Sequence, residues 1–193
     1  MLIIIFDTNF ITMHIILQQI KTGEDTMLYE TGYDRRKAVN YAMKWALSRN
    51  PRYYDFEDIG GDCTNFVSQC LFAGCGVMNH SEPDGWYYNS LNDRSPSWTG
   101  VEFLRSFLLA NTSVGVYGRE AALYELMPGD VIMLVDRSGD IYHSVIVSGV
   151  LYPVTPGNIF ICSHSFDKRH ARLSEYIYHK AAGIHITGAR SYK

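Results

Sequence analysis

The feature that most constrains the fold is the order in which helix-like and strand-like segments follow one another. Apolar residues recur at helical spacing in the first half of the chain, whereas short apolar runs separated by turn residues fill the part after residue 128. Strand-like runs that follow directly on one another pair most simply as an antiparallel sheet. The pattern therefore predicts an α+β fold with N-terminal helices packed on a C-terminal antiparallel β-sheet.

Three helices are expected before the strands. The first covers residues 34–48 and the second residues 62–72, each starting at a residue that can cap a helix. A third begins with a capping box, in which Thr99 is the N-cap and Glu102 follows three residues later. Residues 79–98 are rich in Asn, Asp, Ser, Pro and Trp, so we expect them to form a loop.

The expected strands are runs rich in Val and Ile that are bounded by turn residues. A Pro-Gly turn precedes the first of them, and a Ser-Gly turn separates the first from the second. The strands are predicted at residues 130–135, 142–150, 158–165 and 183–188, with a short amphipathic segment near 172–179.

The length and composition of the chain suit a single domain. Its 193 residues are 47% hydrophobic and 19% charged, which supports a sizeable core and argues against disorder. We assign residues 31–193 to a single domain and residues 1–30 to an N-terminal appendage of uncertain order.

The N-terminal stretch matches neither a secretory signal nor a membrane span. Its apolar runs at residues 2–6 and 15–17 are interrupted by polar residues, and no Lys or Arg precedes Lys21. A signal peptide needs a basic start and roughly 7–15 unbroken apolar residues, and a membrane helix needs about 20. We therefore expect no stable membrane span, and the sequence leaves the cellular location open.

The charge of the chain argues against a nucleic-acid partner. The formal net charge is -3, and the 17 Lys and Arg residues are scattered along the sequence. Proteins that bind phosphate backbones gather basic residues on one face or along one helix. We expect no binding to DNA or RNA.

Cys63 is the strongest candidate for a reactive residue. It follows Gly60, Gly61 and Asp62 at the first turn of the second expected helix. The positive end of a helix dipole favours a thiolate there, and the glycines allow a tight turn and the close approach of a substrate. The alternative is a small buried core residue, as free cysteines often are, and this is our assignment for Cys70 two turns further on.

A nucleophilic cysteine needs a base within hydrogen-bond reach. His143 is the best placed of the seven histidines, because it begins a strongly apolar strand and can point into a cleft. His164 stands near the end of the next expected strand. If the two strands form a hairpin, His164 lies beside His143 as the group that orients the base.

Several motifs resemble one known family. They are GGDCTNFVSQCLFAG around Cys63, the preceding NPRYYDF, the loop motifs GWYY and RSPSWTGV, and the strand motifs LMPGDVIML and YHSVIV. In this order they are similar to the putative amidase domain family, which resembles the papain-like cell-wall hydrolases such as the CHAP domains. The resemblance covers residues from about 33 to 186. GDCTNFVSQ is its most specific motif, and the first thirty residues have no counterpart.

The resemblance implies a papain-like fold and a cofactor-free amide hydrolase that acts, by analogy, on peptidoglycan stem peptides or related bacterial peptides. It carries Cys63 over as the nucleophile and His143 as the general base. His164 corresponds to the polar third residue of such enzymes, with Asp167 as its rival. We expect a peptide-like substrate, no metal and a monomeric protein.

Other residues are expected around the nucleophile. Asp62 either caps the helix or binds substrate. Tyr53 is expected to add a hydroxyl to an oxyanion site formed by backbone N–H groups at the helix start. Trp86 and Trp98, with the neighbouring Tyr87, either line the cleft or pack their loop onto the body of the protein.

Three alternative interpretations remain open. The Cys–His pair could belong to a catalytically inactive ligand-binding module of the same fold. Cys63, His143 and His164 could instead bind zinc, with Cys162 on the same strand face as His164. An acyltransferase would use the same pair, with an amine rather than water as the acceptor.

Overall fold

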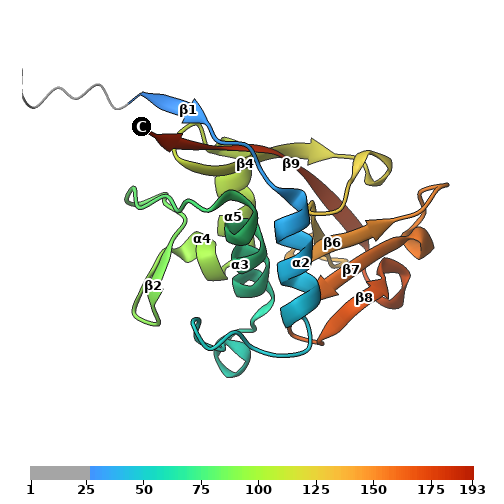
Figure 1. The fold of residues 1–193 in the computed structure, drawn as a ribbon. Coiled ribbons are helices and arrows are strands. Elements are labelled where there is room, and N and C mark those ends of the chain that lie inside the picture. The colour runs from blue at the N-terminus through green and yellow to red at the C-terminus, as the bar shows by residue number, and fades with distance from the viewer. Residues whose placement is uncertain (1–26) are drawn as a thin grey trace, which may run out of the picture.

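A computed structural model describes residues 27–193 of the protein (Figure 1). Its main feature is a seven-stranded sheet in which every neighbouring pair is antiparallel, in the order β1-β9-β5-β6-β7-β8, with β4 also paired to β9. The strands are β1 (Leu28–Glu30), β4 (Gly115–Ala121), β5 (Val131–Val135), β6 (Ile141–Val150), β7 (Ile159–Ser163), β8 (Lys168–Arg172) and β9 (Lys180–Tyr192).

The helices lie together against one part of this sheet (Figure 1). They are α2 (Arg35–Trp45), α3 (Cys63–Cys75), α4 (Pro96–Thr99) and α5 (Val101–Ala110), with single 3-10 turns at Glu57–Ile59, Leu123–Glu125, Pro156–Asn158 and Leu173–Glu175. The helices precede most of the strands in the sequence, so the α+β prediction is confirmed. The Asp34 side chain accepts a hydrogen bond from the Lys37 backbone N–H and caps α2, as expected.

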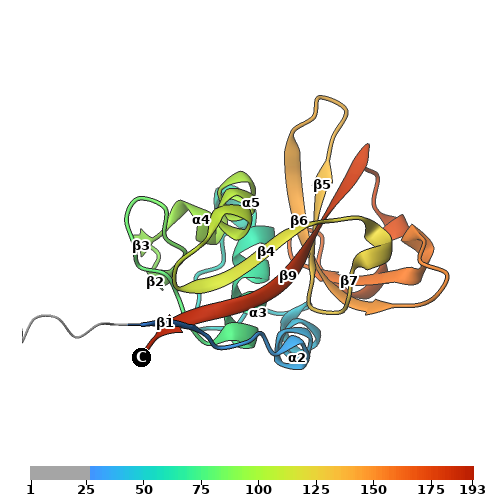
Figure 2. The same cartoon turned by 90° about the horizontal axis from the view of Figure 1, so that it is seen from above.

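One long strand joins the two parts of the sheet. β9 pairs with β5 through residues 180–184, with β4 through residues 183–190 and with β1 through residues 190–192, and Figure 2 shows it crossing the molecule between them. Since β5 leads on to β6 and β7, the helices pack against a surface built from segments far apart in the sequence.

Alternation along the strands creates two cores. Val131 and Met133 of β5 face the helices and join the larger core cluster. Ile132 and Leu134 face the other way and form a second cluster with β6, β7 and Leu173. The strands in the middle of the sheet are therefore buried on both faces, which explains their almost continuous apolar sequence.

The expected capping box at Thr99 is wrong. Pro96 opens a separate short helix, α4, and Thr99 is its last residue. Gly100 precedes α5 and makes no side-chain cap, while the Glu102 carboxylate accepts the Ile141 backbone N–H at 3.4 Å instead. The sequence pattern identified the helix correctly but not the way its start is stabilised.

Three other expectations need correction. The segment 79–98 is not wholly loop, since it holds α4 and the hairpin of β2 (Tyr88–Ser90) and β3 (Asp93–Arg94). β4 was not expected, because its two glycines hide the strand pattern. The expected appendage at residues 1–30 begins to fold before its end, since β1 pairs with β9; its remaining residues lie outside the described part of the chain.

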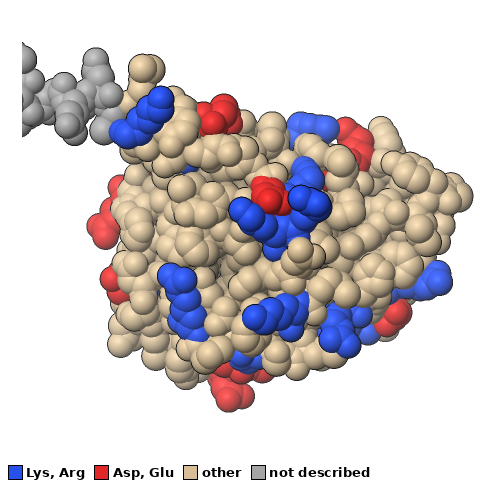
Figure 3. All heavy atoms as spheres, viewed as in Figure 1, with Lys and Arg blue, Asp and Glu red and all other residues tan. Residues whose placement is uncertain are grey.

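On the face seen in Figure 3, Lys and Arg are spread out and mixed with Asp and Glu. Over residues 27–193, no helix is both long enough and apolar enough to cross a bilayer.

Candidate active site

Cys63 is the first residue of α3, as the sequence predicts. Gly60 and Gly61 precede it with φ angles of 116° and 96°, a region that residues with a side chain rarely adopt. A Cβ at Gly61 would also come within 3.2 Å of the Ser165 hydroxyl. The two glycines therefore make the turn that places the Cys63 thiol, half-exposed, at the N-terminal end of the helix.

The other three cysteines are unsuited to act as nucleophiles. All four thiols are free, as expected. Burial raises the pKa of Cys70 well above its ordinary value and that of Cys75 to about 11. Burial also raises the pKa of Cys162, whose sulfur accepts the His170 backbone N–H. Cys63 is therefore the thiol that combines exposure with a helix N-terminus.

Asp62 does neither of the things expected of it. Its side chain makes no capping bond to α3, and it is fully buried, so it cannot touch a substrate in this arrangement. One carboxylate oxygen accepts the Phe56 backbone N–H at 3.0 Å and the Asn65 amide at 2.8 Å. The other oxygen lies 2.5 Å from His164 Nδ1. Asp62 thus bonds two other segments to the start of the helix: the loop before α3 and the residue that follows β7.

His164 does not orient His143, contrary to the prediction. Its Nδ1 contacts Asp62 and its Nε2 lies 2.9 Å from the Trp45 carbonyl oxygen. The carboxylate and the carbonyl are hydrogen-bond acceptors, so both ring nitrogens are occupied by protein partners and neither is available to a substrate. The ring also stacks on Phe66 of α3 at 4.0 Å, which places it behind the nucleophile rather than beside the base.

Asp167, the rival for the third position, also has a different partner. Arg49 binds its carboxylate with two hydrogen bonds of 2.9 and 3.1 Å. The same guanidinium lies 3.2 Å from Asp55 and 3.4 Å from Asp62. Arg49 therefore supplies the positive charge that faces this acidic group, and Asp167 makes no bond to His143.

His143 lies near the start of β6, almost fully buried. Its Nε2 is 3.3 Å from the Tyr176 hydroxyl, which in turn lies 2.6 Å from the Ser163 hydroxyl. Burial lowers the pKa of His143 to about 4, so the imidazole is neutral at pH 7. A neutral imidazole can accept a proton, which is what a general base requires.

A chain of hydroxyl groups links the start of α3 to β6. Cys63 Sγ lies 3.7 Å from Thr64 Oγ1, which lies 3.2 Å from Ser144 Oγ. Because side chains alternate along a strand, His143 projects to the opposite side of β6 from Ser144, and no hydrogen bond joins it to Cys63 among the described residues. α3 and β6 pack together, but the candidate nucleophile and base are not hydrogen-bonded to each other.

Tyr176 connects the two predicted groups. It bonds to His143, and its pKa is raised to about 12, first by burial and in part by the nearby Cys63. No sequence motif pointed to this residue. It follows the turn Leu173–Glu175, in a segment whose sequence pattern is only amphipathic. Thr64 directly follows Cys63 and Ser144 directly follows His143. Both lie in the quoted sequence motifs, which could therefore have pointed to them.

The aromatic residues expected near the substrate belong to the core. Trp86 and Trp98 are fully buried and pack on each other with ring centroids 5.0 Å apart, so they hold their loop down on the body. Tyr53 is buried and stacks on Trp98. No hydrogen bond joins its hydroxyl to Cys63 among the described residues. Tyr87, half-buried, stacks on His80.

The zinc alternative finds no support in residues 27–193. No group of three or more His, Cys, Asp or Glu side chains is arranged there to hold a metal ion. The ring nitrogens of His164 are both bonded to protein oxygens, and Cys162 is buried against Met43.

One hollow of about 390 Å³ is lined by chain neighbours of the candidate site residues but by none of those residues themselves. Tyr142 and Ile177, the chain neighbours of His143 and Tyr176, line it with Tyr178. The Tyr142 hydroxyl donates to the Ile177 carbonyl at 2.8 Å, which joins the two sides.

Sequence comparison places the chain in a family. Residues 32–187 match the family described as the putative amidase domain. The chain belongs to this family. The match spans α2, α3 and the strands up to most of β9, so it includes Cys63, His143 and Tyr176.

Two relatives from Bacillus subtilis (strain 168) are longer proteins. The chain is 40% identical over 119 residues to uncharacterized protein YhbB, covering 60% of this chain and 37% of the relative. It is 36% identical over 78 residues to uncharacterized protein YjcM, covering 40% of this chain and 16% of the relative. No solved structure matches the chain. The putative amidase domain thus spans well under half of these relatives.

Proposed function

We propose that this putative amidase domain hydrolyses amide bonds by cysteine catalysis, with Cys63 as the nucleophile and His143 as the general base. The observation that carries the proposal is the position of Cys63, a half-exposed thiol at the first residue of α3. A helix N-terminus stabilises the thiolate through the helix dipole, and the thiolate is the nucleophilic form. The helix that begins with Cys63 packs on an antiparallel sheet that carries His143, and this packing also supports a papain-like arrangement.

The start of α3 supplies donors for the reaction as well. The first bond within the helix runs from the Phe66 N–H to the Asp62 carbonyl, and no side chain caps the helix. The backbone N–H groups of Cys63, Thr64 and Asn65 consequently have no partner from the helix ladder or a cap. Such donors beside the nucleophile suit the oxyanion that forms when the thiolate attacks a carbonyl.

The reaction then follows in two halves. The Cys63 sulfur bonds to the carbonyl carbon, and the proton that His143 has taken from the thiol goes to the leaving amine as the C–N bond breaks. Water attacks the resulting thioester, His143 accepts its proton, and the acid leaves with the thiol restored. Because no hydrogen bond joins the sulfur to the imidazole in the free protein, the mechanism requires that substrate binding bring them within hydrogen-bond reach.

We propose peptides of the peptidoglycan type as the substrate class, cleaved by the monomer. The support is the resemblance of the motifs around Cys63 and His143 to the putative amidase domain family, which is similar to the papain-like cell-wall hydrolases. The test is digestion of purified peptidoglycan and synthetic stem peptides, with mass spectrometry to find the cleaved bond and any new amide formed by an amine acceptor.

Substitution of the cysteines tests the mechanism. Cys63→Ala is expected to abolish turnover while the protein stays folded, because the nucleophile is lost at a half-exposed position. Cys70→Ala is the matched control on the same helix; it should retain turnover, at a cost in stability of about 1 kcal/mol from the small cavity. Turnover by the Cys63 variant, measured by mass spectrometry of the products, would exclude the mechanism.

Thiol labelling separates an enzyme from an inactive binding module. At mildly acidic pH, iodoacetamide should label Cys63 faster than any other thiol, because burial raises the pKa values of Cys70, Cys75 and Cys162. Peptide mapping identifies the labelled residue, and the Cys63→Ala variant gives the background. If Cys63 reacts no faster than the buried thiols, the chain is the binding module.

A further inference from the structure

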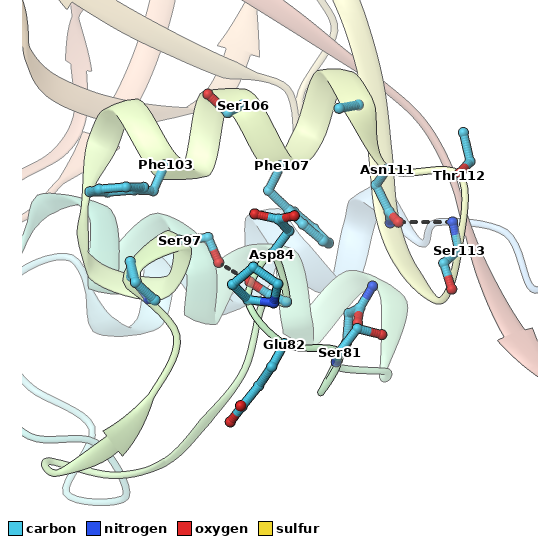
Figure 4. A pocket seen from close by; sticks show the side chains of 15 residues that line it. Ser81, Glu82, Asp84, Ser97, Phe103, Ser106, Phe107, Asn111, Thr112 and Ser113 are labelled. Carbon is cyan, nitrogen blue, oxygen red and sulfur yellow. Dashed lines mark hydrogen bonds between the residues drawn. The ribbon is translucent and has the colours of Figure 1, made fainter.

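The charged groups of the hollow beside α5 are exposed. This hollow, of about 700 Å³, lies between α5 and the loop that holds Glu82 and Asp84. Figure 4 shows these two carboxylates pointing away from each other, and both residues are exposed. Neither Cys63 nor His143 lines the hollow. The polar contacts that bear on the proposed reaction lie instead inside the protein, at His143.

His143 begins a chain of hydrogen-bonding groups that ends at a backbone carbonyl. Its Nε2 lies 3.3 Å from the Tyr176 hydroxyl, and this hydroxyl lies 2.6 Å from that of Ser163. Ser163, the last residue of β7, is fully buried. Its hydroxyl donates to the Phe166 carbonyl at 3.4 Å. Each group in this chain can therefore donate to the next one.

The Phe166 carbonyl sets the direction of these bonds, because a carbonyl oxygen only accepts. Ser163 gives its single hydroxyl hydrogen to that carbonyl, so its oxygen accepts from Tyr176. The Tyr176 oxygen in turn accepts from His143, whose Nε2 must then carry a proton. Burial lowers the pKa of His143 to about 4, so the ring is neutral at pH 7 and has one proton. Its free lone pair consequently lies on Nδ1.

The reverse direction would leave a buried donor without a partner. If Tyr176 donated to His143 Nε2, the ring proton would lie on Nδ1, and no described residue accepts a hydrogen bond from that nitrogen. His143 is almost fully buried, and an unpaired buried N–H group is unfavourable. Ser163 would also have to donate to Tyr176, and the Phe166 carbonyl would lose its bond. The direction from His143 to the carbonyl pairs every hydrogen of the chain.

The turn after β7 places the Phe166 carbonyl where this chain ends. Ser165 and Phe166 have φ angles of 52° and 79°, which residues other than glycine rarely adopt. Such angles persist where surrounding contacts hold them. Here the Ser165 hydroxyl accepts the Asp62 backbone N–H at 2.7 Å and donates to the Glu57 carboxylate at 2.8 Å. The turn is therefore attached to the residue directly before the candidate nucleophile.

We propose that Tyr176 and Ser163 are positioning residues that fix the tautomer of His143. They leave its Nδ1 unprotonated, as the atom that takes the proton of the Cys63 thiol. The transfer gives a thiolate and an imidazolium, and the Nε2–H of that imidazolium still donates to Tyr176. This inference rests on the proposed function, because it assigns a task to residues behind the proposed base.

The tautomer of His143 is measured by two-dimensional NMR of the full chain with 15N-labelled histidine rings. Protonated and unprotonated ring nitrogens have well separated 15N shifts, and the signals of this residue are those that His143→Gln lacks. At pH 7 the wild type should show a proton on Nε2 and none on Nδ1. A proton on Nδ1 instead overturns the proposal.

Ser163→Ala tests whether the chain sets this tautomer. The variant removes the acceptor of the Tyr176 hydroxyl, which can then donate to His143 Nε2, so the form protonated at Nδ1 should rise at least several-fold. Tyr178→Phe is the matched control, because it removes a phenol hydroxyl of the same segment that bonds to neither His143 nor Ser163 among the described residues. If Ser163→Ala leaves the ring signals as in the wild type, the proposal is wrong.

Turnover measures the consequence for catalysis. Tyr176→Phe keeps the ring and removes the hydroxyl, so kcat should fall about tenfold with KM little changed, whereas Tyr178→Phe should keep the kcat of the wild type. An unchanged kcat in Tyr176→Phe would overturn the positioning role. If the wild type cleaves no amide, the proposed function fails, and the NMR spectra still decide whether Tyr176 and Ser163 fix the tautomer.

Discussion

At the candidate site, the surroundings of a buried side chain decide its chemistry more than its residue type does. Among the described histidines, His143 contacts one phenolic hydroxyl, whereas His164 contacts a carboxylate and a backbone carbonyl. His143 lies near the start of β6 and His164 directly follows β7, so the same side chain adjoins an apolar strand in both cases. Their surroundings differ, because burial lowers the pKa of His143 beside Tyr176 whereas His164 faces a buried carboxylate.

The low pKa of His143 makes stability depend on pH. The pKa is about 4 in the folded protein and 6.5 in an unfolded chain, so the unfolded chain binds more protons between these values. Stability should therefore fall as the pH is lowered, by about 2 kcal/mol between pH 7.5 and 5.0 from this residue alone. The measurement is urea unfolding of the wild type and of His143→Gln at both pH values.

The comparison with the variant isolates the contribution of His143, since all other titrating groups are shared. The free energy of unfolding of His143→Gln should decrease less on acidification than that of the wild type. Parallel decreases in the two proteins would show that the imidazole is not buried as the structure has it.

At the scale of elements, two contacts anchor the start of α3. The pair of Asp62 and His164 ties it to the end of β7, and the hydroxyl contact of Thr64 with Ser144 ties it to β6. Three of these four side chains, Asp62, Thr64 and Ser144, are chain neighbours of Cys63 or His143. The position of the thiol relative to the sheet therefore depends on polar bonds at a helix end, where the apolar core does not reach.

Breaking the buried pair should loosen this anchor. His164→Gln leaves the Asp62 charge buried with Arg49 as its remaining cationic neighbour at 3.4 Å, and we expect a loss of about 3–5 kcal/mol in the free energy of unfolding. Adding Asp62→Asn removes the uncompensated charge and should restore part of the loss. Urea unfolding of the wild type, the two single variants and the double variant measures the coupling.

An additive double variant would mean that the two side chains do not interact in the folded protein. Activity gives a second measure, because a positioning role predicts a lower kcat for His164→Gln with substrate KM little changed. The Cys70→Ala variant is the control, because it should lose stability while the Cys63 thiol keeps its position.

At the scale of the whole molecule, β9 holds the fold together. It pairs with three strands and brings β1, close to the start of the described chain, next to the end of the chain (Figures 1 and 2). At Gly183 this strand pairs with both β4 and β5, and a Cβ there would lie 2.6 Å from the Ala121 carbonyl oxygen and about as close to Leu126. The backbone atom cannot move aside, so close packing at this position depends on the missing side chain.

Gly183→Val should consequently destabilise the protein by about 2–4 kcal/mol. Gly157→Ala is the control, because its nearest neighbours lie at 3.8 Å or more and its φ is not in the left-handed region. Thermal unfolding followed by circular dichroism should show a clearly lower Tm for Gly183→Val and little change for Gly157→Ala. Equal Tm values would show that β9 does not bridge the two strands at this point.

Local patterns were sufficient for part of this architecture. α2 with its Asp34 cap, the start of α3 at Cys63, and the strands β5, β6 and β7 all follow from periodicity and turn residues within a few positions of each element. The elements that were missed are short, contain glycine or lie at sheet edges; they are β1, the β2–β3 hairpin, α4, β4 and β8. The strands among them form by pairing with other segments, which a local pattern does not contain.

By itself, the sequence determined the class of fold, the family motifs and the place of Cys63 at a helix start, because each depends on neighbours along the chain. Only the tertiary structure decided that Trp86 and Trp98 are core residues, that His164 pairs with Asp62, and that Tyr176 is the partner of His143. These facts depend on which face of a strand meets which element. β6 and β7 pair in opposite directions, and this pairing sets which element each of their side chains faces. The type of a side chain does not reveal that.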